Sequence, residues 1–435
     1  MKKPIIWFAF DDNVYLCDRF GSPSQLFSKS SYYKTKRVLI VALLLLWVLP
    51  VSVAQTYSPN VITTTVPFLT TAIDARGTAL GFGGVATSPD AFSMFYNPAK
   101  YAFMSNDHTM IASGFNAINY MVPDQYALFD AFAQKIGRSA IAATARYNTS
   151  GEIEIRDEYN QSLGTYRPHE FAIDLAYSRR FGDYLSAGVA GRFIHYALNT
   201  GMLGYEAKSS SIACDASVYY KRPLGNFVDM SLGAAITNIG TKMAYGYADG
   251  RKDFIPTTLR LGSGFKFNFH PKNTLALNLE FNKLMVPTSP IVARDDYGNP
   301  MYNDDGSYQI LYGMDDNVSV FRGMFQSFYD APGYALNTMG EYERVGAFYE
   351  EMCEINTGLG LEYNLADHFF VRTGYYHVPS LKGGVNCLTE GLGMHFGIFG
   401  MDLSYSWYIF NRTGVVTNSQ LAASSRLRWD MYFAF

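Results

Sequence analysis

Apolar and polar residues alternate along much of the chain beyond residue 105. From residue 401 to 409 the odd positions hold Met, Leu, Tyr, Trp and Ile, while the even positions hold Asp, Ser, Ser and Tyr. Residues 275–282 repeat this pattern, with Leu or Phe at every odd position. Successive side chains of a β-strand point to opposite faces, so these segments predict strands with one apolar and one polar face. A soluble β-sandwich has the same period, and alternation alone does not separate it from a membrane barrel.

The lengths of the connections between the predicted strands distinguish a membrane barrel from a soluble β-sandwich. Short turns occur at residues 137–138, 182–183, 223–226, 270–273, 364–367 and 397–400. Long polar connections lie between them, at residues 148–167, 199–209, 240–254, 285–350, 379–386 and 411–420. Short turns at one rim and long loops at the other are typical of an outer-membrane barrel, which has an even number of strands. We therefore predict an all-β fold, a transmembrane antiparallel β-barrel over residues 106–435.

The positions at which the alternating segments begin predict fourteen strands. Their first residues are His108, Gln125, Arg138, His169, Tyr184, Ser210, Phe227, Ile255, Thr274, Cys353, His368, Leu388, Met401 and Leu421. The last strand ends at Phe435, and a terminal Phe resembles the C-terminal signal of bacterial outer-membrane proteins. This strand must finish at the periplasm, which places the short turns there and the long loops outside the cell. The charged residues expected to line the lumen are Arg192, Arg260, Lys266, Glu280, Glu362, Arg372, Asp402 and Asp430.

A secretory leader is predicted ahead of the barrel, over residues 34–54. Three basic residues, Lys34, Lys36 and Arg37, precede a short apolar run at residues 38–49, and Ala54 ends a small-x-Ala cleavage site. The alternative is a membrane anchor, but the run is shorter than the roughly 20 residues that a spanning helix needs. Residues 1–33 are then an upstream extension from a start site placed too early. Residues 55–105 form an N-terminal segment that we expect to plug the barrel or pack on it.

Composition narrows the classes of function. Aromatic residues make up 16% of the chain and charged residues only 17%, which is opposite to a disordered protein. Without residues 1–54 the chain has 28 basic and 35 acidic side chains, so no basic surplus suggests nucleic acid as a partner. The three cysteines that remain, Cys214, Cys353 and Cys387, show no spacing typical of a disulfide framework or a metal site. We interpret them as small apolar residues.

Motifs for catalysis or cofactor binding are weak throughout. Residues 81–86 (GFGGVA) match a dinucleotide-binding string, but no β-α-β context surrounds them. Close passage of one backbone past another explains these glycines better. The acidic pairs at residues 295–296 and 304–305 do not fit an EF-hand loop. His195 with Ser186 or Ser178 could be an esterase-like pair, although a rim histidine is the simpler interpretation. We expect no catalytic, cofactor-binding or metal-binding residues.

The connection at residues 285–350 is far longer than ordinary loops, and loops of this length are commonly functional. Val318, Phe321, Phe325 and Phe328 recur in it at helical spacing. This predicts a short helix that either caps the barrel or presents an aromatic patch to a partner. Aromatic side chains provide much of the binding energy at interfaces. The candidate partner-binding residues are Tyr297, Tyr302, Phe321, Phe325 and Phe328.

Several strings together resemble one protein family. Residues 74–76 (DAR), 81–91 (GFGGVATSPDA) and 97–100 (NPAK) are similar to the N-terminal segment of FadL-type outer-membrane barrels. Residues 235–240 (AITNIG), 254–257 (FIPT), 282–288 (NKLMVPT), 321–328 (FRGMFQSF) and 330–333 (DAPG) resemble the PorV group within them. The resemblance implies a fourteen-stranded barrel in the outer membrane that belongs to the type IX secretion system.

The same resemblance implies a binding role without chemistry. Such a protein collects the C-terminal signal domain of cargo at an SprA-type translocon and delivers it to a PorU-containing attachment complex. The first alternative is a FadL-type transporter of hydrophobic small molecules, because a fold does not fix a function. The second is a lipid A-modifying enzyme or accessory factor that acts on outer-membrane lipid.

Overall fold

The computed structural model describes residues 57–105, 108–117, 124–200, 206–244, 252–410 and 427–435, together with three short strands near the N-terminus. These strands, β1 (Trp7–Phe10), β2 (Asn13–Cys17) and β3 (Pro23–Ser28), form an antiparallel sheet of their own. The predicted leader at residues 34–54 lies outside the described residues. Among the described residues, no helix combines the length and hydrophobicity needed to cross a membrane.

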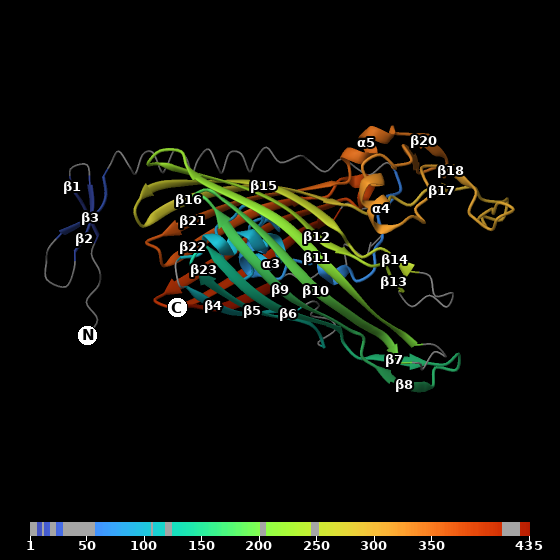
Figure 1. The fold of residues 1–435 in the computed structure, drawn as a ribbon, viewed down its shortest axis with the longest axis horizontal. Helices are drawn as coiled ribbons and strands as arrows, with labels where there is room; N and C mark the ends of the chain where they lie inside the picture. Colours follow the sequence, from blue (N-terminus) through green and yellow to red (C-terminus); the bar gives the residue numbers. More distant parts are fainter. Residues whose placement is uncertain are drawn as a thin grey trace. The chain divides into compact units, whose positions relative to one another are not determined.

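Fourteen antiparallel strands close into a barrel, as the alternation predicts (Figure 1). The strands are β4 (Thr109–Ala117), β5 (Gln125–Ile136), β6 (Ser139–Ser150), β9 (His169–Phe181), β10 (Leu185–Thr200), β11 (Glu206–Pro223), β12 (Val228–Gly240), β15 (Thr258–His270), β16 (Asn273–Leu284), β21 (Ile355–Leu365), β22 (Phe369–His377), β23 (Val385–Phe396), β24 (Phe399–Phe410) and β25 (Leu427–Ala434). The last strand pairs with the first, and Arg428 lies opposite Asn116. The predicted start at Leu421 lies outside the described residues.

Alternate side chains of the strands face lipid and lumen. On β5, residues 127, 129, 131 and 133 are buried, and the residues between them are exposed. Many of the exposed positions on the strands are large and apolar, for example Leu175 at 66% and Val189 at 58% exposure. An outward apolar band with an inward polar or small-residue face is the arrangement that a bilayer requires of a barrel.

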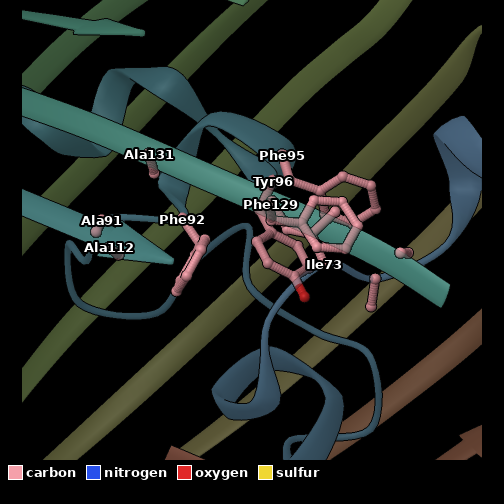
Figure 2. Packing of buried hydrophobic residues seen from close by; sticks show 10 residues of the cluster. Ile73, Ala91, Phe92, Phe95, Tyr96, Ala112, Phe129 and Ala131 are labelled. Carbon is pink, nitrogen blue, oxygen red and sulfur yellow. The ribbon is translucent and has the colours of Figure 1, made fainter. Parts of the chain in front are cut away.

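The N-terminal segment lies inside the lumen and packs on the barrel wall. It contains η1 (Pro67–Thr70), α2 (Ala75–Ala79), α3 (Ser93–Tyr96) and η2 (Pro98–Phe103), and α3 lies inside the ring of strands in Figure 1. Phe92, Phe95 and Tyr96 of this plug pack against Phe129 and its alanine neighbours on the barrel wall (Figure 2). We use "plug" below for residues 67–105.

The long connections carry small elements of their own. One contains the hairpin of β7 (Ile153–Arg156) and β8 (Ser162–Tyr166), and another pairs β13 (Met243–Ala244) with β14 (Lys252–Asp253). The largest, which we call the cap, comprises residues 285–354. Its elements are β17 (Ile291–Val292), β18 (Ile310–Tyr312), α4 (Val320–Gln326), β19 (Tyr334–Leu336), β20 (Tyr342–Arg344) and α5 (Ala347–Met352). They gather at the end of the barrel opposite the C-terminus (Figure 1).

Candidate functional site: the plug and the cap

Plug backbone lies directly on inward-facing glycines of the wall. A Cβ atom on Gly233 would lie 2.1 Å from the carbonyl oxygen of Val85, and one on Gly374 would lie 2.2 Å from the amide nitrogen of Gly81. Gly81 itself has φ of +69°, a conformation that side chains other than glycine rarely adopt. The glycine-rich residues 81–86 therefore serve close packing of the plug backbone on the wall, as predicted.

Charged side chains of the wall bind an arginine and backbone amides of the plug. Arg76 bonds to Glu362 and Asp90, each at 2.9 Å. Glu280 of β16 accepts the amide protons of Gly84 and Val85 at 2.6 and 2.8 Å. These contacts bind the plug to strands nearly 200 and 300 residues further along the chain. Sequence reasoning places the wall charges in the lumen correctly but gives no indication that plug groups are their partners.

Most of the predicted luminal charges are buried in this network. Arg192 binds Asp174 and Asp215, Arg260 binds Glu280, and Arg372 joins Glu362 to Asp402. Lys266 remains exposed, beside the cavity at the C-terminal end of the barrel. Burial and the neighbouring Asp90 raise the pKa of Asp74, in the plug, to about 6. Burial lowers the pKa of Lys100, whose ammonium group donates to the carbonyl of Gly84 at 2.8 Å.

The plug lies between two cavities at opposite ends of the same strands. A cavity of about 320 Å³ is lined by Arg76 and Asp90 of the plug and by His108 and Ala434 near the short turns. A second, of about 210 Å³, is lined by Phe82 and Phe95 of the plug and by wall residues close to the cap.

The cap is fastened to the barrel by a buried cluster of charges. Glu350 and Glu351 are on α5, and Glu354 lies just beyond it. Lys382 contacts Glu350 at 2.8 Å and Glu354 at 3.0 Å, while Lys283 at the end of β16 contacts Glu351 at 3.2 Å and also binds Glu354. The two ammonium groups thus join three carboxylates of one segment to the end of β16 and to the connection between β22 and β23.

The same carboxylates hold the backbone of the cap in place. Glu351 accepts the amide proton of Ala331 at 2.9 Å, and Glu350 accepts that of Gly333 at 2.8 Å. Asp330 accepts the amide proton of Thr288 at 3.2 Å. Burial and the nearby Glu351 and Glu354 raise the pKa of Asp330 to about 7. These ion pairs and hydrogen bonds therefore hold the cap in a fixed arrangement, and we call this buried charge cluster with the backbone that it holds the platform.

Helix α4 and the residues just beyond it turn their phenyl groups outward. Phe321 and Phe325 are 69% and 68% exposed, and Phe328 is 45% exposed. The inner face carries Gly323, whose Cβ position lies 2.8 Å from the ring of Phe254, and the buried Met324 and Gln326. Val318 is buried with Phe254 and Val286, and it precedes the helix, which begins at Val320. Of the two expected roles, this arrangement favours an exposed aromatic patch.

The other candidate residues lie on a different part of the cap. Tyr297 and Tyr302 belong to the extended hairpin between β17 and β18, where Tyr297 is 91% exposed and the ring of Tyr302 lies 5.0 Å from that of Tyr308. Sequence reasoning misses Phe348 and Tyr349 of α5, which are also exposed. The sequence pattern that could have indicated these two residues is an aromatic pair next to two glutamates in a short helix, residues 347–352 (AFYEEM).

The proposed pairing of His195 with Ser186 or Ser178 is wrong. His195 lies nine positions after Ser186 on β10, and an odd offset along a strand places the two side chains on opposite faces. Ser186 and Ser178 are buried, and the hydroxyl of Ser186 donates to the carbonyl of Ala99 in the plug at 2.7 Å. His195 instead bonds to Ser210 at 2.9 Å on an exposed surface. Within the described ranges no cluster of His, Cys, Asp or Glu side chains could hold a metal ion.

A closed barrel with an apolar outer band, a luminal plug and short turns at its C-terminal rim defines a β-barrel protein of the outer membrane. The family model described as "Type IX secretion system protein PorV" matches residues 54–291, more than half of the sequence. The chain therefore belongs to the PorV family of type IX secretion system proteins.

Solved structures similar to this chain are outer-membrane barrels of low sequence identity. The toluene transporter TbuX of Ralstonia pickettii is 11% identical, with 84% of this chain and 98% of that chain covered and a TM-score of 0.44. A FadL homologue of Pseudomonas aeruginosa is also 11% identical, with coverages of 88% and 98% and a TM-score of 0.41. Likeness at this level says nothing about what the present chain binds. The search of curated proteins found no match.

Proposed function

We propose that this PorV-family protein binds the C-terminal signal domain of cargo at an SprA-type translocon and carries it to a PorU-containing attachment complex. The observation that carries the proposal is the outward-facing aromatic patch of α4, supported on a platform of buried charges. Membership of a type IX secretion family supplies the context. Recognition of a folded domain needs such a surface and no catalytic group.

The patch has the features of a binding surface. Large exposed aromatic groups are unusual on a helix in water, and a cluster of them commonly marks an interaction site. Phe321 and Phe325 lie one helical turn apart, so a partner can cover both at once. The rigid platform beneath them lowers the entropy that is lost when the partner binds.

Site-specific photo-crosslinking in cells tests this role. A photoreactive residue at position 325 is expected to capture proteins that carry the C-terminal signal domain. A photoreactive residue at Tyr159, which is 75% exposed on the separate β7–β8 hairpin, is the matched control. Capture from position 159 but not from position 325 would contradict the proposal, as would normal cargo export in a deletion strain.

The transporter alternative has one observation in its favour, the partly apolar cavity of about 210 Å³ on the cap side of the plug. It also requires a path past the plug, whose backbone is packed on wall glycines. Uptake of a hydrophobic compound into liposomes that contain the purified protein would support it, and absence of uptake would leave the secretion role.

A further inference from the structure

Several buried polar side chains on three adjacent strands of the wall lack hydrogen-bond partners. Arg428 of β25 is 1% exposed, and its Nε and Nη1 groups have no acceptor within the described ranges. Asn116 lies opposite Arg428 on β4, and Ser404 lies opposite it on β24. Both of these side chains are also 1% exposed and have no partner among the described residues. The three polar groups form one row across the inner face of the wall.

This row lies between the two cavities of the lumen. Arg428 lines the cavity on the cap side, and Tyr432 of the same strand lines the cavity at the C-terminal end. Four residues of a strand span roughly 13 Å, and Asp430 lies midway between the two. One oxygen of Asp430 accepts the amide proton of Ala75 at 2.6 Å, and the other has no partner in the described structure. Unpaired polar groups therefore extend from one cavity towards the other.

The part of the plug that covers this row has mostly small side chains. Helix α2, with the sequence ARGTA, lies against β23, β24 and β25. Ala79 packs on the wall so closely that a Cβ atom on Gly391 would lie 2.5 Å from its own Cβ atom. Arg76, which has the longest side chain of α2, bonds to Glu362 instead. The alanines and the glycine of this helix cannot reach the unpaired groups of the wall.

We propose that a chain of ordered water molecules fills this seam, the space between α2 and the polar row, and lets water cross the plugged barrel. This activity goes beyond the proposed binding of cargo. Donors and acceptors are both unpaired in the seam, since Arg428 and the amide nitrogen of Asn116 donate, whereas Asp430 and the amide oxygen of Asn116 accept. An anion would satisfy only the donors. Water donates and accepts, and buried water commonly bridges such groups.

The seam is selective for water because the plug is packed tightly beside it. A Cβ atom on Gly374 of β22 would lie 2.2 Å from the amide nitrogen of Gly81, which leaves no space for a solute there. The charges of Arg428 and Asp430 are opposite and lie two residues apart on one strand, so water between them contacts both. We therefore expect water to pass and sucrose to be excluded.

Stopped-flow light scattering of proteoliposomes tests the water path. Vesicles that contain the full chain should shrink faster in hyperosmotic sucrose than protein-free vesicles do. Ser404→Val and Asn116→Leu, which replace a polar group of the seam by an apolar one, should each remove most of the protein-dependent rate. Ser113→Val, at an exposed position on the opposite face of β4, is the matched control and should keep the wild-type rate.

Three results would overturn the proposal: a wild-type rate equal to that of protein-free vesicles, equal rates in the wild type and both seam variants, or entry of sucrose. Heat-dependent migration on a denaturing gel shows which variants retain the barrel. If neither seam variant folds, the temperature dependence of the wild-type rate decides. Flow through a chain of water should depend weakly on temperature, whereas the steep dependence of protein-free vesicles would exclude the seam as the path.

Discussion

Asp330 makes the packing of the cap sensitive to pH. Its side chain is 1% exposed, one oxygen accepts from Thr288, and the other has no partner among the described residues. Burial and the neighbouring Glu351 and Glu354 raise its pKa to about 7, against a usual value near 4. The packed cap therefore holds a proton, between about pH 4 and pH 7, that an opened cap would release.

Because the packed form binds the extra proton, its stability is fully present below about pH 4 and is lost as the pH rises through about 7. We expect proteolysis of the cap to become faster from pH 5.5 to pH 8.5. Asp330→Asn, which stays neutral, should be cleaved more slowly than the wild type at pH 8.5. The difference in cleavage rate between the two proteins should be smaller at pH 5.5. Asp296→Asn, at an exposed position of the same cap, is the control at each pH. Equal ratios for the two variants at both pH values would exclude Asp330 as the responsible group.

At the scale of elements, the contact between plug and wall depends on residues without side chains. Gly233 on β12 faces Val85, whereas Gly191 on β10 has open space around its Cβ position. Gly233→Ala should displace the plug, because a Cβ atom cannot lie 2.1 Å from a carbonyl oxygen. We expect a lower thermal midpoint and transient conductance in planar bilayers. Gly191→Ala should keep the wild-type midpoint and conductance, and identical behaviour of the two variants would show that the plug tolerates the added atom.

The phenyl groups of α4 allow a separate prediction, because they contribute area to a partner but little to the fold. Both Phe321 and Phe325 are about two-thirds exposed, so Phe→Ala at either should change the free energy of unfolding by no more than about 0.5 kcal/mol. A residue at the centre of an interface costs about 2 kcal/mol or more when truncated, roughly a thirtyfold loss of affinity. Binding of a purified cargo signal domain by surface plasmon resonance measures this loss. Tyr159→Ala should bind as wild type does, and full affinity in Phe325→Ala would place the cargo elsewhere.

The strands can be predicted from the sequence because the pattern that marks them lies within each strand. Lipid on one side and plug on the other impose a period of two, so fourteen strands are predictable from alternating residues. The plug route is not predictable in this way, because Glu280 and Val85 meet although 195 residues separate them. Helical spacing locates α4 but not which way its phenyl groups face. That direction depends on Gly323 packing against Phe254, a contact between two connections.

At the scale of the whole molecule, the buried ion pairs of Lys283 and Lys382 join the cap to the barrel among the described residues. Lys283→Met would remove a positive charge that pairs with the buried carboxylates of Glu351 and Glu354. Removing one partner of a buried ion pair typically costs about 3–5 kcal/mol of stability. This cost falls on the cap, because the strand ladder of β16 with β21 does not depend on the ammonium group. We expect the variant to reach the outer membrane and keep heat-modifiable migration, while its cap becomes sensitive to protease added to intact cells.

Cargo export should fall together with this protection if the platform is needed to present the aromatic patch. Lys266→Met removes a luminal lysine that takes no part in the cap, so protection and export should both remain normal in that variant. Measuring both the protease protection of the cap and the export of cargo therefore shows whether export depends on the platform. A cleavable cap with normal export would show that cargo does not need the platform. A protected cap in Lys283→Met would show that Lys382 and the amide protons of Ala331 and Gly333 are sufficient to hold it.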